Sequence, residues 1–384
     1  MPGYRRLLQL PPKGKHSIFL FGPRGTGKTS WIKEHLPSIL YIDLLETVTY
    51  QTFLANPALL QKRIPEGFTH WIVIDEIQKI PDLLNEVHRL IEQHHYRFLL
   101  TGSSARKLRR KGVNLLAGRA FEYHMHPLTC EEMGSDFSLH TALTFGLLPF
   151  VYSEGDDPQH YLDSYIATYL REEVQQEALV RNIGEFSRFL QVASFSQGQS
   201  INYSEIAREA AIERRVVSSY FELSHDLLLS CTLPVFTKKA KRRMVAQPKF
   251  YFFDVGVYRA IRPKGPLDIT EEIDGAALET LFLQHLIAFN NYYRLGYEFY
   301  YWRTSNQLEV DFIAYGECGL FAFEIKRKRS ISSRDLTGLK AFGDDYPMAK
   351  LYMVYGGDHD EFSGKINVVP FEKMLFQLKK ILSA

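Results

Sequence analysis

The chain has few cysteines and no long apolar segment, and each shortage excludes a class of protein. Cys130, Cys231 and Cys318 lie far apart without C-x-x-C spacing, which argues against a zinc site or a disulfide framework. No apolar run approaches the roughly 20 residues that cross a bilayer, so we expect no membrane contact. The first residues lack the apolar core of a secretory signal. We therefore expect a cytoplasmic protein with reduced thiols.

The chain also has little net charge. Its 46 Lys and Arg residues against 44 Asp and Glu residues give a net charge of +2. Any contact with nucleic acid therefore needs a local basic patch. With 45% hydrophobic and 23% charged residues and no internal repeat, the composition is that of a folded soluble protein. A length of 384 residues predicts two or three domains.

The most informative segment is glycine-rich and fits the phosphate-binding pattern G-x-x-x-x-G-K-[ST]. It follows an apolar run, Ser17–Phe21, that predicts a buried strand, and it precedes the helix-forming residues Thr29–His35. Strand, glycine-rich turn and helix is the context that the pattern requires. We therefore predict that ATP or GTP is bound by Gly22, Pro23, Arg24, Gly25, Thr26, Gly27, Lys28, Thr29 and Ser30.

Each residue type in this segment has a task in nucleotide binding. Glycines let the backbone curl, so that successive N–H groups converge on phosphate oxygens. Lys28 supplies positive charge to the β- and γ-phosphates, and Thr29 offers a hydroxyl to Mg²⁺. The alternative is a glycine-rich turn with an accidental lysine, and the strand and helix around it favour the nucleotide site.

Residues Ile39–Asp43 predict a second strand, and helical periodicity predicts a helix over residues 51–62. A third apolar strand, Trp71–Ile74, is followed by two acids. Asp75, delivered beside the phosphate loop, can hold Mg²⁺, usually through water. Glu76 is placed to polarise an attacking water; the alternative is an exposed acid at a strand end. We predict Asp75 as metal ligand and Glu76 as catalytic base.

Further candidates follow the next predicted strand, Arg97–Ser104. Thr101 or Ser103 can orient the water or sense the γ-phosphate, although turn chemistry explains such residues equally well. The basic run at 106–111 favours a solvated helix face. Arg119 can stabilise charge that develops in phosphoryl transfer, and spacing alone leaves that role open.

Residues 139–195 show helical periodicity, and helices there can form a lid over the nucleotide domain. The stripe of Tyr161, Tyr165 and Tyr169 favours core packing. Next comes a short predicted helix capped by Ser204, a break at 211–212, and a longer helix that begins at 214. Short helix, tight turn and longer helix is the helix-turn-helix plan.

Two β-like stretches, Leu233–Thr237 and Lys249–Phe253, are joined by a basic tip and predict the wing of a winged helix. Basic and hydroxyl residues on the longer helix and on this tip can contact a DNA groove and its phosphates. The alternative is a winged helix used for packing or protein contact. The predicted DNA-binding residues are Arg214, Arg215, Ser218, Ser219, Lys238, Lys239, Lys241, Arg242 and Arg243.

The last third predicts a helix at 275–293 and strands at 297–302, 308–315, 319–326 and 350–355, with a helix at 334–342 before the last. Asp311 lies on one strand, and Glu324 and Lys326 share one face of the next. Carboxylates that converge across strands can hold Mg²⁺, and a nearby lysine can help to activate water. The alternative is a salt-bridged cluster of acids and lysine.

Four motifs, in the order GPRGTGKTS, WIVIDEIQKIP, LLTGSSA and LAGRA, resemble those of prokaryotic AAA-type ATPases that carry a C-terminal domain long labelled as of unknown function. The resemblance implies a P-loop domain in which a strand lies between the loop strand and the Asp-Glu strand, a place that Ile39–Asp43 fits. It makes Arg119 an arginine-finger or sensor candidate. It also implies that a homo-oligomer completes the ATP site.

The last third also resembles the restriction-endonuclease-like fold of the PD-(D/E)xK type, whose pattern is an acid, then Asp, then Glu-x-Lys. Asp311, Glu324 and Lys326 match the pattern, and Glu279 in the preceding helix matches the helical acid. The resemblance implies a second Mg²⁺ site on Glu279, Asp311 and Glu324, with Lys326 beside it.

The predicted architecture is α/β in four parts: a P-loop AAA-type core (1–135), a helical lid or linker (136–199), a winged helix (200–255) and a restriction-endonuclease-like domain (256–384). The leading hypothesis is an ATPase that uses ATP and Mg²⁺, binds DNA, branched or forked, and couples hydrolysis to its remodelling or translocation. One alternative is a nucleotide-dependent signalling or assembly switch whose winged helix contacts protein. Another is an ATP-gated, Mg²⁺-dependent DNA nuclease.

Overall fold

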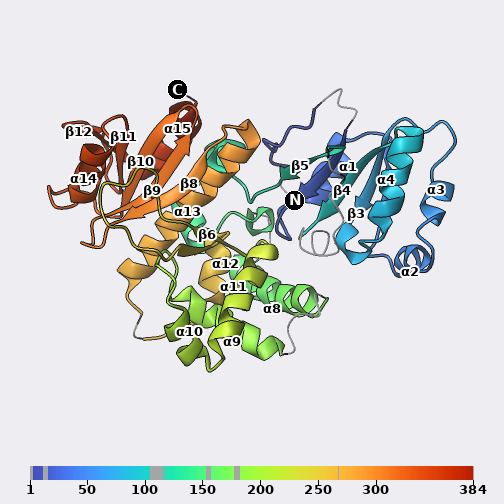
Figure 1. The fold of residues 1–384 in the computed structure, drawn as a ribbon, viewed down its shortest axis with the longest axis horizontal. Coiled ribbons are helices and arrows are strands. Elements are labelled where there is room, and N and C mark those ends of the chain that lie inside the picture. Colours follow the sequence, from blue (N-terminus) through green and yellow to red (C-terminus); the bar gives the residue numbers. More distant parts are fainter. Residues whose placement is uncertain are drawn as a thin grey trace. The chain divides into compact units, whose positions relative to one another are not determined.

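The computed structural model describes residues 3–11, 16–103, 116, 118–152, 157–176, 182–266 and 268–383 (Figure 1). The chain divides into two compact units. The nucleotide unit comprises Arg6–Pro127 and Asp226–Leu229, and the second unit comprises Met1–Arg5, Leu128–His225 and Ser230–Ala384. The predicted division into four parts remains a prediction. The basic run at 106–111 lies outside the described residues.

The nucleotide unit is built on a parallel five-stranded sheet in the order β2-β3-β4-β1-β5. Its strands are β1 (Ser17–Phe21), β2 (Leu40–Asp43), β3 (Trp71–Asp75), β4 (Arg97–Gly102) and β5 (Ala120–His124). Its helices are α1 (Lys28–His35), α2 (Thr47–Ala55), α3 (Leu59–Arg63), the 3₁₀ turn η1 (Ile77–Lys79) and α4 (Leu83–His94). The sheet residues are almost continuously apolar and buried, as expected for parallel strands.

Two predictions for this unit need correction. The helix predicted over residues 51–62 is two helices, because Pro57 offers no backbone N–H and holds Asn56 in extended backbone. The strand expected between the loop strand β1 and the Asp-Glu strand β3 is β4 in the sheet, whereas β2 lies at the edge. The other predicted strands of the sheet are confirmed to within two residues.

The helical part of the second unit begins at Cys130. Its helices are α6 (Cys130–Met133), η2 (Gly134–Asp136), α7 (Leu139–Phe145), η3 (Pro149–Tyr152), α8 (Pro158–Gln176), α9 (Ile183–Ser194), α10 (Tyr203–Ala210), α11 (Arg214–Asp226) and α12 (Val255–Ile261). Tyr165 and Tyr169 are buried, which confirms core packing for the aromatic stripe. The cap of α10 is Asn202, whose side chain accepts from the N–H of Glu205, and not Ser204.

A mixed six-stranded sheet in the order β12-β13-β11-β10-β9-β8 completes the second unit. Its elements are α13 (Thr270–Tyr293), β8 (Glu298–Arg303), β9 (Glu309–Gly316), β10 (Gly319–Lys326), α14 (Thr337–Asp345), β11 (Lys350–Tyr355), β12 (Glu361–Ser363), β13 (Ile366–Pro370) and α15 (Phe371–Leu382). The two helices and four strands predicted up to residue 355 are present; the strands at 319–326 and 350–355 have the predicted ends, and the other elements differ at one or both ends. The last three elements were not predicted.

The predicted wing differs from the observed hairpin. Its strands are β6 (Ser230–Leu233) and β7 (Lys249–Phe252), which pair antiparallel, so the strand predicted over Leu233–Thr237 is wrong. The intervening segment 234–245 instead lies along β8: Phe236 N–H donates to Tyr301 O at 2.7 Å and Val245 N–H to Arg303 O at 3.2 Å. The side chain of Phe236 is buried in the core of the six-stranded sheet, which draws the segment away from a free-standing wing.

Candidate functional site

The phosphate-loop segment forms a tight turn between β1 and α1. Gly25 and Gly27 have φ angles of 80° and 89°, a left-handed backbone that glycine adopts without strain. The ammonium of Lys28 donates to the carbonyl oxygens of Gly22 at 2.6 Å and of Pro23 at 3.1 Å. A side chain at Gly22 would collide with Met125, since its Cβ would lie 2.3 Å from that carbonyl oxygen. The loop therefore curls as phosphate binding requires.

An arginine from the N-terminal segment supports this loop. The guanidinium of Arg6, which is nearly buried, donates to Thr26 O at 2.5 Å and to His126 O at 2.6 Å. It thereby links the middle of the loop to the segment that follows β5. Sequence reasoning missed Arg6, because no local pattern marks a contact made 20 residues along the chain.

Asp75 is the hub of the site and accepts hydrogen bonds from three hydroxyl groups. Thr29 donates from α1 at 3.1 Å, Thr101 donates from β4, and Tyr41 donates from β2. These side chains meet because the carboxyl ends of parallel strands lie at one edge of the sheet. Asp75 and Thr101 are buried. Thr101 also accepts from the N–H of Glu76 at 3.2 Å, so it contacts both acids.

Tyr41 and Gln78 were not predicted. Burial, reinforced by the neighbouring Asp75, raises the pKa of Tyr41, so its hydroxyl stays protonated and remains a donor. Gln78 is buried, and its amide donates to the carboxylate of Glu76 and to Ser103 Oγ at 3.1 Å. Glu76 itself has a φ of 61°. Glu76 is therefore held at two points: Gln78 of η1 holds its carboxylate, and Thr101 of β4 holds its backbone N–H.

Arg119 lies at the other end of the sheet. Its carbonyl oxygen accepts from the N–H of Ser17 at 3.0 Å, at the start of β1, whereas the phosphate loop follows the end of that strand. Five residues of strand separate the two ends by about 16 Å at roughly 3.3 Å per residue. Its guanidinium pairs with Glu92. The role predicted for Arg119 stays a prediction. At this distance from the phosphate loop of its own chain, the arginine would have to act on ATP bound to another subunit.

In the second unit the acids predicted as a metal site meet a lysine that sequence reasoning missed. The ammonium of Lys249, on β7, lies 2.5 Å from Glu309, 3.3 Å from Asp311 and 3.8 Å from Glu279. Tyr251, two residues along β7, donates to Glu279 at 2.8 Å. The β6–β7 hairpin and the six-stranded sheet of the second unit therefore both contribute to one group of charged side chains, which we call the acid–lysine cluster.

The remaining predicted residues complete this acid–lysine cluster. Lys326 lies 2.6 Å from Glu324, as predicted for residues on one strand face. Glu324 accepts from the N–H of Asp311 at 3.3 Å, and Asp311 accepts from the N–H of Ile325 at 2.9 Å. Burial, and then the charge of Asp311, raise the pKa of Glu324. Within the described ranges, no group of three or more His, Cys, Asp or Glu side chains is arranged to hold a metal ion.

A cavity of about 480 Å³ reaches this cluster from one side. Of the cluster residues, Glu279 contributes to its wall, together with Phe195, Gln197, Tyr258 and Arg262. The guanidinium of Arg262 lies 4.4 Å from the ring centre of Phe195 and pairs with Asp268 at 3.1 Å. The cavity wall is therefore mixed in charge and does not select an anion or a cation.

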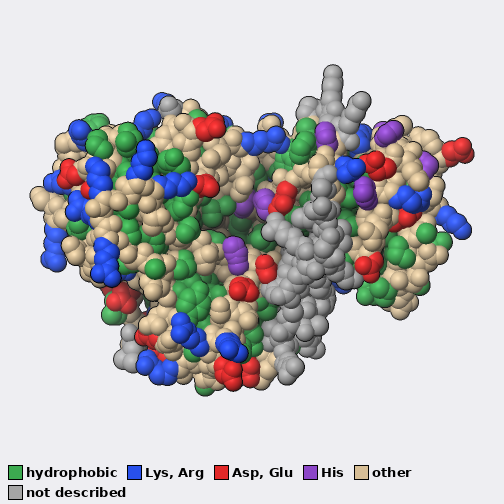
Figure 2. Space-filling view, viewed as in Figure 1, with side chains coloured by type: hydrophobic (Ala, Val, Ile, Leu, Met, Phe, Trp, Pro, Cys, Tyr) green, Lys and Arg blue, Asp and Glu red, His purple; other side chains and the backbone are tan. Residues whose placement is uncertain are grey.

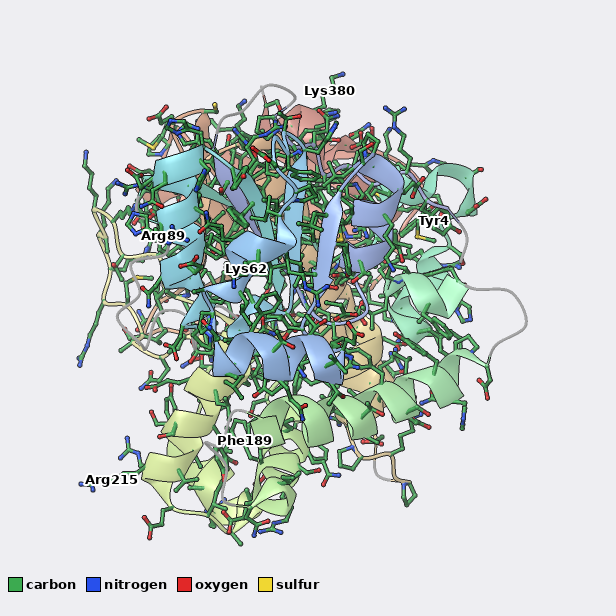
Figure 3. The ribbon with its side chains drawn as sticks, turned by 90° about the vertical axis from the view of Figure 1, so that its right-hand side faces the viewer. Tyr4, Lys62, Arg89, Phe189, Arg215 and Lys380 are labelled. Carbon is green, nitrogen blue, oxygen red and sulfur yellow. The ribbon has the colours of Figure 1, made fainter. Side chains whose placement is uncertain are left out.

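The predicted DNA-binding residues divide into two groups. Arg214, Arg215, Ser218 and Ser219 are exposed on one face of α11, opposite the buried Val217, and Arg215 points outward in Figure 3. On the segment beside β8, two of the basic residues have acidic partners and three have none within the described part of the chain. The paired residues are Lys238, with Glu298 at 2.7 Å, and Arg242, with Asp345 at 2.7 Å; the others are Lys239, Lys241 and Arg243.

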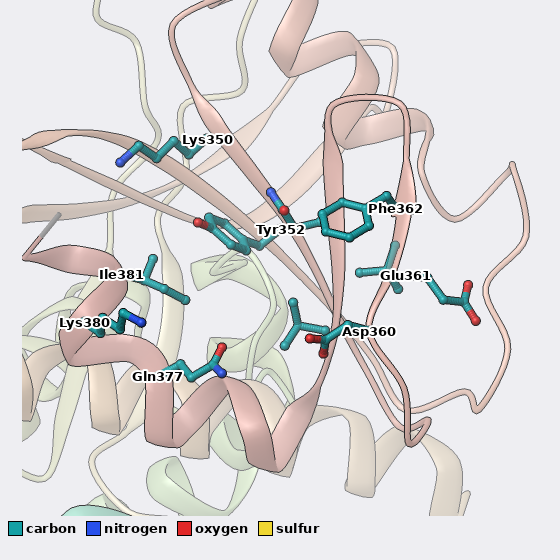
Figure 4. Close-up of a pocket in the computed structure, with 11 residues that line it drawn as sticks. Lys350, Tyr352, Asp360, Glu361, Phe362, Gln377, Lys380 and Ile381 are labelled. Atoms are coloured by element: carbon teal, nitrogen blue, oxygen red, sulfur yellow. The ribbon is translucent and has the colours of Figure 1, made fainter.

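The surface carries charges of both signs and a further cavity. Figure 2 shows Lys and Arg side chains scattered among acidic ones on the face drawn, without one dominant basic patch. A cavity of about 300 Å³ lies beside β12 and is lined by Tyr352, Asp360, Gln377 and Lys380 among others (Figure 4). None of the predicted site residues lines it. In the described part of the chain no helix has the length and apolar character needed to span a membrane.

Comparisons with known proteins agree with the nucleotide unit and leave the rest open. Residues 14–134 match an AAA domain, and residues 136–269 and 274–374 match two domains of unknown function, DUF8612 and DUF4143. Uncharacterised proteins of Mycobacterium bovis and Mycobacterium tuberculosis are each 28% identical over 369 residues, which cover 93% of this chain and 80% of each relative.

Two solved structures are similar over part or most of the chain. The ORC1 protein of Aeropyrum pernix in complex with DNA is 14% identical, with a TM-score of 0.27, over 65% of this chain and 87% of that one. Protein VC1899 of Vibrio cholerae is 11% identical, with a TM-score of 0.23, over 95% and 97%. The AAA match, the phosphate loop and the parallel sheet together support a P-loop AAA-type ATPase.

Proposed function

We propose that this protein is an Mg²⁺-dependent ATPase that binds DNA, of branched or forked form, and couples ATP hydrolysis to the remodelling or translocation of that DNA. The observation that carries the catalytic part is the contact between Thr29 and Asp75, with Glu76 adjacent. A hydroxyl and a carboxylate side by side are hard oxygen ligands of the kind Mg²⁺ prefers, and nucleotide phosphates and water complete its shell. These residues therefore fit the metal.

In this proposal each residue of the site has one task. Lys28 and the loop N–H groups neutralise the phosphates, and Thr29 and Asp75 would hold Mg²⁺, which supplies charge stabilisation at the β- and γ-phosphates. Glu76 orients a water and takes its proton. Thr101 positions both acids, since its hydroxyl donates to Asp75 and accepts from the N–H of Glu76.

The DNA part of the proposal rests on α11. A positive face on a helix that follows a short helix and a three-residue turn is a suitable surface for a DNA groove. Arg214 and Arg215 lie in its first turn, where they are not neutralised by ion-pair partners in the part of the chain that the structure describes. Few base-reading side chains accompany them, so we infer recognition of DNA shape and backbone over base sequence.

An ATPase assay on a panel of duplex, single-stranded, forked and four-way DNA tests the coupling. We expect binding and stimulation of hydrolysis to be greatest with forked or four-way DNA. Equal hydrolysis with and without every DNA, together with no DNA binding, would contradict the DNA part while leaving the ATPase assignment intact.

Charge reversal on α11 separates DNA binding from protein contact. The double variant Arg214→Glu/Arg215→Glu should weaken DNA binding at least about tenfold and should lower the slope of log affinity against log salt by about 2, since two phosphate contacts are lost. The matched control is Lys62→Glu/Arg63→Glu, which reverses two adjacent exposed charges on α3. We expect this control to bind DNA as the wild type does, as measured by fluorescence anisotropy at several salt concentrations.

A second candidate function is a nucleotide-dependent switch that uses this region for protein contact. It is favoured by the ion pairs of Lys238 and Arg242, which engage part of the predicted DNA surface within the second unit. Under this alternative, charge reversal at Arg214 and Arg215 leaves DNA binding unchanged because there is none to lose. The nuclease alternative is less favoured, because the ammonium of Lys249 contacts Glu279 and Asp311, two of the acids that it requires.

Removal of the Tyr41 hydroxyl should weaken the metal part of the ATP site. Because Tyr41 orients the carboxylate of Asp75, we expect Tyr41→Phe to raise the Mg²⁺ concentration for half-maximal ATPase activity by about 10- to 100-fold, as for other groups behind a metal ligand. The measurement is an Mg²⁺ titration at saturating ATP. Tyr50→Phe, on α2 of the same unit, is the control and should titrate as the wild type does; an unchanged titration in Tyr41→Phe would contradict the role.

A further inference from the structure

Lys249 has an unusual position for a lysine, because its side chain is 3% exposed and ends among carboxylates. Its ammonium lies within 4 Å of Glu279, Glu309 and Asp311, which come from α13 and β9. The burial of a lone ammonium is strongly unfavourable unless opposite charges and hydrogen bonds compensate for it. These three carboxylates supply that compensation, so lysine and acids depend on one another.

The backbone of Lys249 restricts where this ammonium can go. Lys249 pairs with Leu233 on β6 and forms a bridge with Ser200 on its other side. Its side chain passes beside the ring of Tyr301, with the ammonium 5.4 Å from the ring centre. The strand is held on both sides and the side chain is enclosed, so the ammonium has no exposed position to withdraw to without movement of β7.

The charges of the acid–lysine cluster are nearly balanced without any further ion. Asp311 and Glu279 face Lys249, Glu309 lies between Lys249 and Arg303 at 2.5 and 3.3 Å, and Glu324 faces Lys326 at 2.6 Å. Each carboxylate therefore has a cation, an N–H group or a hydroxyl as partner. A divalent ion at Asp311 would have to displace the ammonium or lie beside it, and like charges at such separations repel strongly in a buried site.

We propose that the ammonium of Lys249 is the resident cation of the acid–lysine cluster, so that Glu279, Asp311 and Glu324 do not bind a divalent metal in this chain. The acids that match a nuclease pattern instead fasten β7 to α13 and to the six-stranded sheet. This inference concerns the second unit alone and does not depend on the proposed ATPase or DNA functions.

Binding of Mn²⁺ to the full-length, nucleotide-free protein tests the proposal, with free Mn²⁺ measured by electron paramagnetic resonance. Every protein in the series carries Asp75→Asn, which removes the carboxylate that we propose as an Mg²⁺ ligand in the ATP site. We expect this parent protein to bind no more Mn²⁺ than the same protein with Asp311→Asn added. We expect Lys249→Met, which deletes the internal cation, to gain a stoichiometric Mn²⁺ site that Asp311→Asn abolishes.

The matched control is Lys326→Met, which removes the other lysine of the cluster but leaves Lys249 beside Asp311; it should gain no site. A stoichiometric Mn²⁺ site in the parent protein that is lost with Asp311→Asn would overturn the proposal. A folded Lys249→Met protein that gains no site would also overturn it. If Lys249→Met does not fold, Lys249→Gln, which is shorter but keeps an uncharged polar end group, takes its place in the same comparison.

Discussion

ATP hydrolysis by the Glu76→Gln variant should fall by about 10²- to 10⁴-fold, the usual contribution of a general base. The amide cannot accept the proton of the attacking water, but its oxygen can still accept from Gln78, as the carboxylate does in the wild type. The loop residues that we propose hold the phosphates are unchanged. We therefore expect ATP to bind with affinity close to that of the wild type, as measured with a fluorescent ATP analogue.

Lys28→Ala is the companion variant, because it removes the charge that we propose contacts phosphate while leaving Glu76 in place. It should lose both nucleotide binding and hydrolysis. Hydrolysis at the wild-type rate in Glu76→Gln would show that Glu76 is not the base. Loss of ATP binding in that variant would instead assign Glu76 to nucleotide binding.

Asp254→Ala should destabilise the second unit by roughly 3–5 kcal/mol, since a cap and buried hydrogen bonds are lost together. Asp254 is fully buried at the start of α12. Its carboxylate accepts from the N–H groups of Gly256 at 2.8 Å, Val257 at 3.1 Å and Leu147 at 2.8 Å. It therefore caps one helix and fixes the segment after α7 to it.

Two glycines show how closely the segment after α7 approaches the start of α12. A Cβ at Gly256 would lie 2.1 Å from Phe145 O, and one at Gly146 would lie 2.1 Å from Asp254 Oδ1. The backbone has no room to close over a missing carboxylate, so its N–H partners would be left buried without acceptors. Because a chain of two units does not unfold in one step, hydrogen exchange of α7 and α12 amides is the appropriate measurement.

Ser138→Ala is the control for this prediction, because Ser138 caps α7 through one N–H, that of Thr141 at 3.3 Å. It should cost about 1 kcal/mol. If Asp254→Ala and Ser138→Ala lower amide protection equally, the additional hydrogen bonds of Asp254 contribute nothing to stability.

The same carboxyl group gives a pH dependence whose sign is fixed. Burial outweighs the N–H donors and raises the pKa of Asp254 to about 6, compared with about 3.9 in an unfolded chain. Between these values the folded protein binds the extra proton, so the stability that this group contributes is complete below about pH 4 and falls as pH rises through about 6. The difference in stability between the wild type and Asp254→Asn, measured across that pH range, isolates the pH dependence that Asp254 contributes.

The candidate nucleotide site was predictable where its residues are neighbours in sequence. Glycines and Lys28 share one loop, and Asp75 follows a strand that is apolar on both faces, so short patterns locate both. The hydroxyl of Tyr41 and the guanidinium of Arg6 reach the site from distant segments, across 34 and 20 residues respectively. Nothing in their local sequence distinguishes them from ordinary surface or core residues.

The second unit shows the converse limit. Strands such as Gly319–Lys326 and Lys350–Tyr355 were predicted with their observed ends, because a glycine or a lysine bounds each largely apolar run. Lys249 looked like the first residue of a wing strand, and only the packing of that strand against β9 makes it the partner of Asp311. Sequence patterns located the acids but could not show what neutralises them.

The segment that lies along β8 has a consequence for the behaviour of the protein in a crowded solution. The outermost strand of a sheet offers unpaired backbone groups to other chains, and proteins blunt such edges with lysines, short strands or covering loops. Here the segment 234–245 covers β8 with a lysine-rich stretch, and the opposite edge strand, β12, has 3 residues. The positive charges of the segment 234–245 therefore also disfavour self-association through this edge of the sheet. This role does not depend on any binding partner.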